Sequence, residues 1–117
     1  MELSVVIPVF NEVESIARLL DEICVQLGDK LDYEIIVVDD GSTDSTPGVL
    51  QSSRQQHAQL RILRHRVRCG QSAAIGSGVE AAAAPCIATL DGDGQNPPSE
   101  VPRLVAPLLA ADCSPAL

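Results

Sequence analysis

The sequence contains few aromatic and few basic residues. Its 117 residues include one phenylalanine, one tyrosine and no tryptophan, and eight lysines and arginines stand against sixteen aspartates and glutamates, for a formal net charge of -8. A surface that binds nucleic acid needs a basic face, usually with aromatic side chains that stack on bases. The composition therefore excludes nucleic acid as an expected partner.

Long apolar runs and paired cysteines are also missing from the sequence. No stretch approaches the roughly 18 to 20 apolar residues that a membrane-spanning helix needs. The apolar residues 3–10 contain Pro8 and follow no basic leader, unlike a secretory signal, so we expect a cytoplasmic protein. The four cysteines form no C-x-x-C pair and have no histidine at ligand spacing, which predicts neither a zinc site nor a redox pair.

Short apolar runs alternate with helical patterns along the chain. Residues 3–9, 33–39, 60–64 and 86–90 have the apolar character of strands buried on both faces. Helices are predicted at 16–27, 44–56 and 71–83, with a fourth from about 98, and Asn11 with Glu14 resembles a capping box before the first. Gly76 and Gly78 would let the third helix approach a neighbour closely. The alternation predicts one α/β domain with a mostly parallel sheet and helices on both faces.

Acidic residues and turn formers follow the second and fourth predicted strands. Residues 39–44 read Asp-Asp-Gly-Ser-Thr-Asp, and residues 91–98 read Asp-Gly-Asp-Gly-Gln-Asn-Pro-Pro. The carboxyl ends of parallel strands share one edge of the sheet, where ligands bind in such folds. Strings of this kind also occur as ordinary turns and helix caps. However, carboxylates within about 5 Å of each other repel by roughly 3 kcal/mol at an effective dielectric near 20, and a divalent cation would turn that repulsion into affinity.

The second acidic string has the spacing of a metal site. In an extended segment Asp91 and Asp93 point the same way and can face one cation, while Gly92 permits a close approach. The side-chain carbonyl of Gln95, two residues further on, could join them. Ligand sets made only of oxygen favour Mg²⁺ or Mn²⁺. We therefore predict that Asp91, Asp93 and Gln95 hold one of these ions.

Three motifs in order resemble those of family 2 glycosyltransferases. They are Val-Val-Ile-Pro-Val-Phe-Asn-Glu at 5–12, Glu-Ile-Ile-Val-Val-Asp-Asp-Gly-Ser-Thr-Asp at 34–44, and Asp-x-Asp-x-Gln-Asn-Pro-Pro at 91–98. A fourth motif, Gly-Gln-Ser-Ala-Ala-Ile at 70–75, resembles one that polyprenyl-phosphate sugar transferases share. These are enzymes of the dolichyl-phosphate mannosyltransferase and undecaprenyl-phosphate aminoarabinose transferase type. The resemblance implies the Rossmann-like GT-A fold. Residues 1–117 would form its nucleotide-sugar-binding half, truncated before the acceptor-binding half.

The resemblance also implies a donor, an acceptor and a set of binding residues. The donor would be a UDP- or GDP-linked sugar, and the acceptor a polyprenyl phosphate at the inner face of the membrane. Asp40 would accept hydrogen bonds from the base, and the metal ligands would be those named above. The nucleotide-binding residues would be Pro8, Phe10, Asn11, Glu12, Asp39, Asp40, Gly41, Gln71 and Gly92. No general base is predicted within the chain. Phe10 stands where the family more often has tyrosine, and Gly92 and Gly94 stand where alanine and leucine are common.

Two alternative functions remain open at this point. A signalling receiver domain is also acidic, of similar length and dependent on Mg²⁺, but its aspartate pair follows the first strand and it needs a late lysine. Here the pair follows the second strand, and the only lysine is Lys30. The other alternative is a nucleotide- and metal-binding fragment without transfer activity, because the chain stops one predicted helix after the metal motif. A truncated sheet would also expose an unpaired edge and favour self-association.

Half of the basic residues lie within one short segment. It contains Arg61, Arg64, Arg66 and Arg68, with His65 among them. Such a segment could contact a lipid phosphate or an anionic membrane surface, or it could be a solvated edge strand and loop. Neither His57 nor His65 has a neighbour in the sequence that would indicate a catalytic base.

Overall fold

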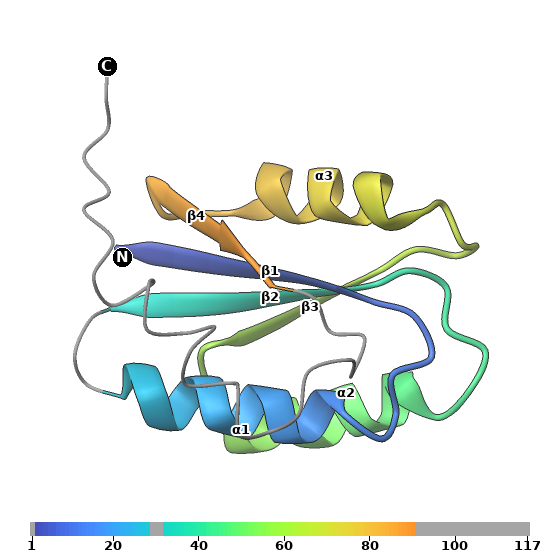
Figure 1. Ribbon diagram of the computed structural model, residues 1–117, viewed down its shortest axis with the longest axis horizontal. Helices are drawn as coiled ribbons and strands as arrows, with labels where there is room; N and C mark the ends of the chain where they lie inside the picture. Colours follow the sequence, from blue (N-terminus) through green and yellow to red (C-terminus); the bar gives the residue numbers. More distant parts are fainter. Residues whose placement is uncertain (1, 29–31, 91–117) are drawn as a thin grey trace.

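The computed structural model describes residues 2–28 and 32–90 (Figure 1). Several predicted features lie outside the described residues: the metal ligands Asp91, Asp93 and Gln95, the nucleotide-binding residue Gly92, and the fourth helix. The elements, in chain order, are β1 (Leu3–Val9), α1 (Ile16–Leu27), β2 (Tyr33–Asp39), α2 (Thr46–Gln56), β3 (Leu60–Arg64), α3 (Gln71–Ala81) and β4 (Cys86–Thr89). None of the described helices has the length and apolar character that crossing a membrane requires.

The four strands form one parallel sheet in the order β3-β2-β1-β4. Helices α1 and α2 lie against one face and α3 lies against the other (Figure 1). The predicted parallel sheet with helices on both faces is therefore confirmed. The bounds of the first three strands agree with the prediction. The fourth strand ends one residue early, α2 begins at Thr46 instead of 44, and α3 ends at Ala81 instead of 83.

The central strands divide their side chains between two apolar cores. Because successive strand residues point to opposite faces, Val5 and Ile7 of β1 pack toward α1 with Ile35, whereas Val6 packs toward α3 with Ile36. Every residue of β2 is buried. This burial on both faces explains why the two strands read as unbroken runs of valine and isoleucine.

Helix α3 lies close to the sheet because one of its residues has no side chain. A Cβ atom added at Gly78 would collide with the side chain of Val6 and lie 3.2 Å from Cγ2 of Val38. A Cβ added at Gly76 would meet nothing within 4 Å. The predicted close approach is thus confirmed for Gly78 and wrong for Gly76.

The predicted capping box at the start of α1 is wrong. The residue before the helix is Ser15, and it makes no capping hydrogen bond with its side chain. Asn11 lies well before this point with a positive φ of 52°, and its side-chain oxygen accepts a hydrogen bond from the Thr43 backbone N–H at 2.8 Å. A contact with the loop after β2 has therefore taken the place of a local cap.

A buried polar network anchors the connection between α3 and β4 at the amino end of the sheet. Oε2 of Glu34 accepts hydrogen bonds from the Ser4 hydroxyl at 2.6 Å and from the Ala83 backbone N–H at 2.8 Å, and Oε1 accepts one from Arg61 at 3.0 Å. Burial of Glu34 raises its pKa, but these hydrogen bonds and the Arg61 charge outweigh burial and hold the pKa below its ordinary value. The network fixes the segment that leads into β4.

Candidate functional site

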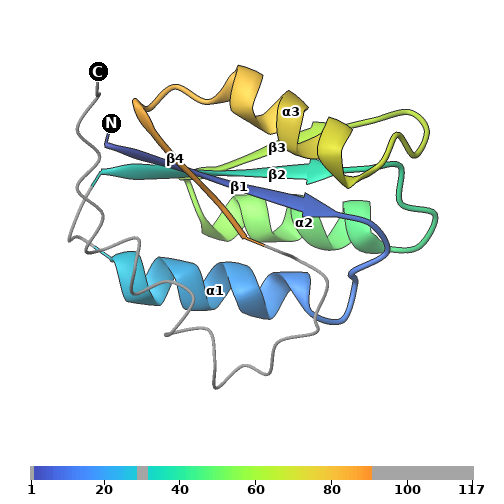
Figure 2. The same ribbon diagram turned by 45° about the horizontal axis from the view of Figure 1, so that its top comes forward.

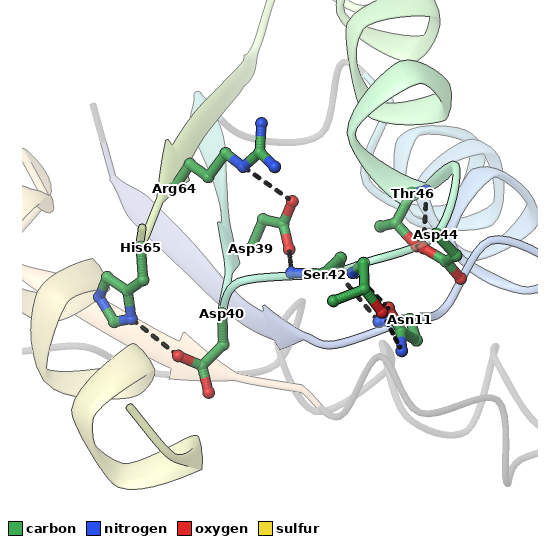
Figure 3. A network of polar contacts seen from close by, with 9 residues as sticks. Asn11, Asp39, Asp40, Ser42, Asp44, Thr46, Arg64 and His65 are labelled. Atoms are coloured by element: carbon green, nitrogen blue, oxygen red, sulfur yellow. Dashed lines mark hydrogen bonds and ion pairs between the residues drawn. The ribbon is translucent and has the colours of Figure 1, made fainter. Parts of the chain in front are cut away.

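The loops that follow β1, β2 and β3 meet at the carboxyl edge of the sheet. Because the strands are parallel and adjacent, Val9, Asp39 and Arg64 lie side by side in register where the strands end. Backbone hydrogen bonds continue past the strand ends, from Asp40 N–H to Val9 at 2.8 Å and from His65 N–H to Asp39 at 2.9 Å. Figure 3 shows the polar side chains that this edge brings together.

Asp40 is the centre of the edge. Its side chain is buried, with the residue only 3% exposed. Oδ1 accepts hydrogen bonds from the Cys69 backbone N–H and from His65 Nδ1, both at 2.8 Å, and Oδ2 accepts one from the Gly70 backbone N–H at 2.9 Å. Burial raises the pKa of Asp40, but the three donors and the His65 charge outweigh burial and lower it below its ordinary value. Asp40 is therefore a fixed, ionised acceptor that clamps the loop after β3.

His65 connects Asp40 to helix α3. Its Nδ1 bonds to Asp40, and its Nε2 lies 2.8 Å from the hydroxyl of Ser77. The ionised carboxylate can only accept, so Nδ1 carries a proton and donates to it. The Ser77 hydroxyl donates to Nε2 when the ring is neutral and accepts from it when the ring is protonated. Sequence reasoning found no partner that would indicate His65 as a catalytic base; the structure gives it two partners, Asp40 and Ser77. His57 likewise lies 2.7 Å from Asp21, which links α2 to α1.

Asp39 shapes the turn that follows β2. Its carboxylate is fully buried, and Oδ1 accepts a hydrogen bond from the Ser42 backbone N–H at 3.0 Å. Within the described part of the chain Oδ2 has no hydrogen-bond partner, and its ion-pair partner, Arg64 Nε, lies 3.9 Å away (Figure 3). A buried carboxylate oxygen that lacks a hydrogen bond is unusual, and here it lies at the edge where the sequence predicts a ligand.

The turn after β2 is held between the two loops that flank it. The Ser42 hydroxyl accepts a hydrogen bond from the Asn11 backbone N–H at 2.9 Å, which ties the turn to the loop after β1. On the other side, Gly41 adopts a φ of 76°, and an added Cβ would lie 2.7 Å from the Arg68 backbone nitrogen. Only glycine meets both the conformation and the space at this position.

An aromatic and a cationic side chain stack beside this turn. The guanidinium carbon of Arg68 lies 4.1 Å from the ring centroid of Phe10, a cation–π distance. Phe10 follows β1 directly and is half-buried. The edge therefore combines a buried anionic acceptor with an apolar ring and an exposed cationic side chain.

The described residues of the predicted nucleotide site all lie at or next to this edge. Glu12 lies in the loop after β1, and Gln71 is the first residue of α3. Sequence reasoning missed the contacts of the basic segment. At this edge Arg64 contacts the buried carboxylate of Asp39, and His65 contacts that of Asp40. At the amino end of the sheet Arg61 contacts the buried carboxylate of Glu34. Their position on β3, the neighbour of β2, is the signal that could have revealed it. Contact of this segment with a lipid phosphate remains a prediction.

The fold is an α/β domain whose polar loops gather at the carboxyl ends of parallel strands, where ligands bind in such folds. The family model described as glycosyl transferase family 2 matches residues 4–114. The chain belongs to this family, which removes the support for a receiver domain.

Relatives and solved structures agree with this assignment. The chain is 44% identical over 108 residues to the undecaprenyl-phosphate 4-deoxy-4-formamido-L-arabinose transferase of Pseudomonas fluorescens, a match that covers 88% of this chain and 31% of that protein. It is similar to S. aureus TarS in complex with UDP, with a TM-score of 0.72, 26% identity, and 80% and 28% of the two chains covered. The mannosyltransferase PcManGT of Pyrobaculum calidifontis, in complex with GDP-Man and Mn²⁺, gives a TM-score of 0.68 and 26% identity, with 79% and 27% covered. The GT-A fold is thus confirmed.

Proposed function

We propose that this chain is the nucleotide-sugar-binding half of a GT-A glycosyltransferase. The observation that carries the proposal is the Asp40 carboxylate, buried at the carboxyl edge and fixed by three donors. A carboxylate has about four acceptor positions, so one position remains for an N–H group of a nucleotide base. Phe10, with Pro8 and Glu12, would complete the base and ribose pocket.

The diphosphate of the donor would bind next to the base site. Asp91 follows β4 by two residues in the sequence, and β4 runs parallel to β1, so its carboxyl end lies at the same edge. We propose Asp91, Asp93 and Gln95 as ligands of Mg²⁺ or Mn²⁺; support comes from the similar mannosyltransferase, whose solved complex contains Mn²⁺. When bound, such an ion neutralises charge on the departing nucleoside diphosphate.

The proposed reaction moves the sugar to a polyprenyl phosphate. Support comes from the Pseudomonas fluorescens relative, which is named for an acceptor of this class, undecaprenyl phosphate. An acceptor phosphate oxygen forms a bond to the anomeric carbon as the bond from that carbon to the diphosphate breaks, and the nucleoside diphosphate leaves with the electron pair. A phosphate acceptor is already anionic at pH 7 and needs little help from a general base.

The acceptor site would lie in the part of the relatives that this chain does not match. The chain spans 31% of the length of the Pseudomonas fluorescens transferase and 28% of the matched TarS chain. We propose that the 117 residues bind the donor nucleotide but transfer sugar slowly or not at all without an acceptor half. A radiolabelled sugar-transfer assay with a polyprenyl phosphate checks this, and rapid turnover would contradict it.

Calorimetric titration tests the role of Asp40. A hydrogen bond to a charged acceptor contributes about 1.5–3 kcal/mol, so Asp40→Asn should weaken UDP or GDP binding by roughly 10- to 150-fold. Inorganic pyrophosphate, which has no base, should bind both proteins alike. Asp44→Asn is the matched control, because Asp44 is exposed and bonds only within its own turn, to Thr46. Equal nucleotide affinity in the Asp40 variant and the wild type would contradict the proposal.

A further inference from the structure

A second potential metal site lies at the same edge of the sheet, around Asp40. The ligand atoms of Asp40, His65 and Cys69 all lie within 4.8 Å of one another, and these residues form the only such group of three in the part of the chain that the structure describes. Asp40 is buried, His65 is half-buried and Cys69 is exposed, so the group opens toward solvent on the Cys69 side. We propose that these three residues bind Zn²⁺.

The geometry of the three side chains is close to that of a zinc site. Tetrahedral zinc with bonds of about 2.0–2.3 Å separates its ligand atoms by roughly 3.3–3.8 Å. The longest separation here therefore needs to shorten by about 1 Å, and the 2.8 Å between Asp40 and His65 needs to widen by somewhat less. Rotation of Cys69 can adjust the two separations that involve its sulfur, which is held by a weak contact with the Val67 carbonyl oxygen at 3.3 Å. The separation between Asp40 and His65 must change through those two side chains.

The chemistry of the three ligands selects zinc over the ions proposed for the aspartate motif. A set of one carboxylate oxygen, one imidazole nitrogen and one thiolate sulfur suits Zn²⁺, whereas Mg²⁺ and Mn²⁺ prefer oxygen alone. Three protein ligands would leave the fourth position to water. Binding releases the Cys69 thiol proton to solvent. In His65 the proton shifts from Nδ1 to Nε2, so Nδ1 can bind the ion.

The groups around the ligands already have the arrangement that holds zinc ligands in place. A zinc-binding histidine usually donates its other ring N–H to a polar partner, and Nε2 of His65 lies 2.8 Å from the Ser77 hydroxyl. Ligating carboxylates are themselves hydrogen-bonded, and Asp40 accepts from the backbone N–H groups of Cys69 and Gly70. These supporting hydrogen bonds exist before any ion arrives, whereas the hydrogen bond between Asp40 and His65 must give way to the ion.

The sequence did not predict this site because its ligands come from separate loops. His65 and Cys69 lie four residues apart after β3, which is not a familiar zinc spacing by itself. The third ligand, Asp40, comes from the turn after β2 and joins them only because β2 and β3 are neighbours in the sheet. The expectation of no zinc site rested on the absence of a C-x-x-C pair and of a histidine at ligand spacing, and neither criterion includes an aspartate from another loop.

Titration with Co²⁺, a spectroscopic substitute for Zn²⁺, tests the proposal on the 117-residue chain without nucleotide. The wild type should develop a thiolate-to-cobalt charge-transfer band in the near ultraviolet, and Zn²⁺ should bleach it because Zn²⁺ binds more tightly than Co²⁺. Cys69→Ser should lose the band, whereas the matched control Cys24→Ser should keep it. Ser77→Ala should weaken Co²⁺ binding by about tenfold or more.

Two results would overturn the zinc site. They are the absence of a band in the folded wild type, and a band that persists in Cys69→Ser. Far-UV circular dichroism should show that Cys69→Ser is folded, because the backbone N–H of Cys69, and not its thiol, bonds to Asp40. A further consequence rests on the proposed function: Zn²⁺ should lower nucleotide affinity by occupying Asp40. The cobalt band needs no nucleotide, so failure of the two proposals can be told apart.

Discussion

Replacement of Asp40 by asparagine should destabilise the folded chain strongly. The carboxylate accepts from Cys69, His65 and Gly70 through both oxygens, whereas an amide has a single acceptor oxygen. Its NH₂ group must therefore face one of these donors. One charge-assisted hydrogen bond is lost at about 1.5–3 kcal/mol, and a buried N–H is left without a partner. We expect a loss of about 2–4 kcal/mol in the free energy of unfolding.

Urea unfolding followed by far-UV circular dichroism measures this loss, since the sequence has no tryptophan and a single tyrosine. With a slope of about 2 kcal/mol/M, in the middle of the range for small proteins, the midpoint for Asp40→Asn should fall by roughly 1–2 M. Asp44→Asn should lie within about 0.5 kcal/mol of the wild type, because the asparagine side-chain oxygen can accept the same hydrogen bonds from Thr46. If the two variants were equally stable, Asp40 would not be the clamp that the structure indicates.

The pH dependence gives a second check on the same residue. Burial raises the folded-state pKa of Asp40, but its three hydrogen-bond donors and the His65 charge outweigh burial and lower this pKa below its ordinary value. Its stabilising contribution is therefore present above the ordinary carboxyl pKa, about 3.9, and is lost as pH falls toward the folded-state value. The stability gap between wild type and Asp40→Asn should narrow as pH falls below about 4. A gap that stays constant as pH falls below this value would refute the assignment.

Four further substitutions test the packing and the second buried network. Gly78→Ala should cost about 1–3 kcal/mol by overpacking α3 on Val6, while Gly76→Ala in the same helix should stabilise the protein by roughly 0.5–1 kcal/mol. Thermal unfolding distinguishes the two variants, and equal effects would contradict the close approach of α3 to the sheet at Gly78. Gly41→Ala should lower stability by at least about 2 kcal/mol through strain and collision with the loop after β3, measured by urea unfolding, and a neutral effect would contradict that contact. Glu34→Gln should reduce the loss of stability in acid below about pH 4, because the pKa of Glu34 is lowered against burial by its donors; an unchanged acid profile would show that this carboxyl does not matter.

Much of the fold follows from the sequence because its strands are buried on both faces. Strands β1 and β2 lie between two helical layers, and such strands favour apolar residues on both faces. Their bounds could therefore be read from valine and isoleucine runs such as 35–38. The 3.6-residue period of α1 is equally direct, since Ile16, Leu20, Ile23 and Leu27 all face the core.

The parts that could not be predicted depend on contacts between distant segments. Asn11 carries a local capping signature, but the loop after β2 offers its side chain a hydrogen bond with Thr43, and the long-range contact prevails. His65 gains its partner only because β3 lies beside β2, which places it next to a residue 25 positions earlier. The family motifs at 5–12 and 34–44 do lie together, at the carboxyl ends of β1 and β2. The predicted ligands Asp91, Asp93 and Gln95 lie outside the described residues and stay a prediction.

Calorimetric titration of UDP and GDP with and without Mn²⁺ is the measurement that tests the central claim most directly. The claim is that the carboxyl edge of this sheet holds a donor nucleotide together with a divalent cation. We predict that one of the two nucleotides binds at least tenfold more tightly with Mn²⁺. Asp93→Ala should remove that gain, whereas Asp21→Ala, on the outer surface of α1, should retain it. Nucleotide binding that ignores Mn²⁺, or that Asp93→Ala leaves unchanged, would contradict the claim.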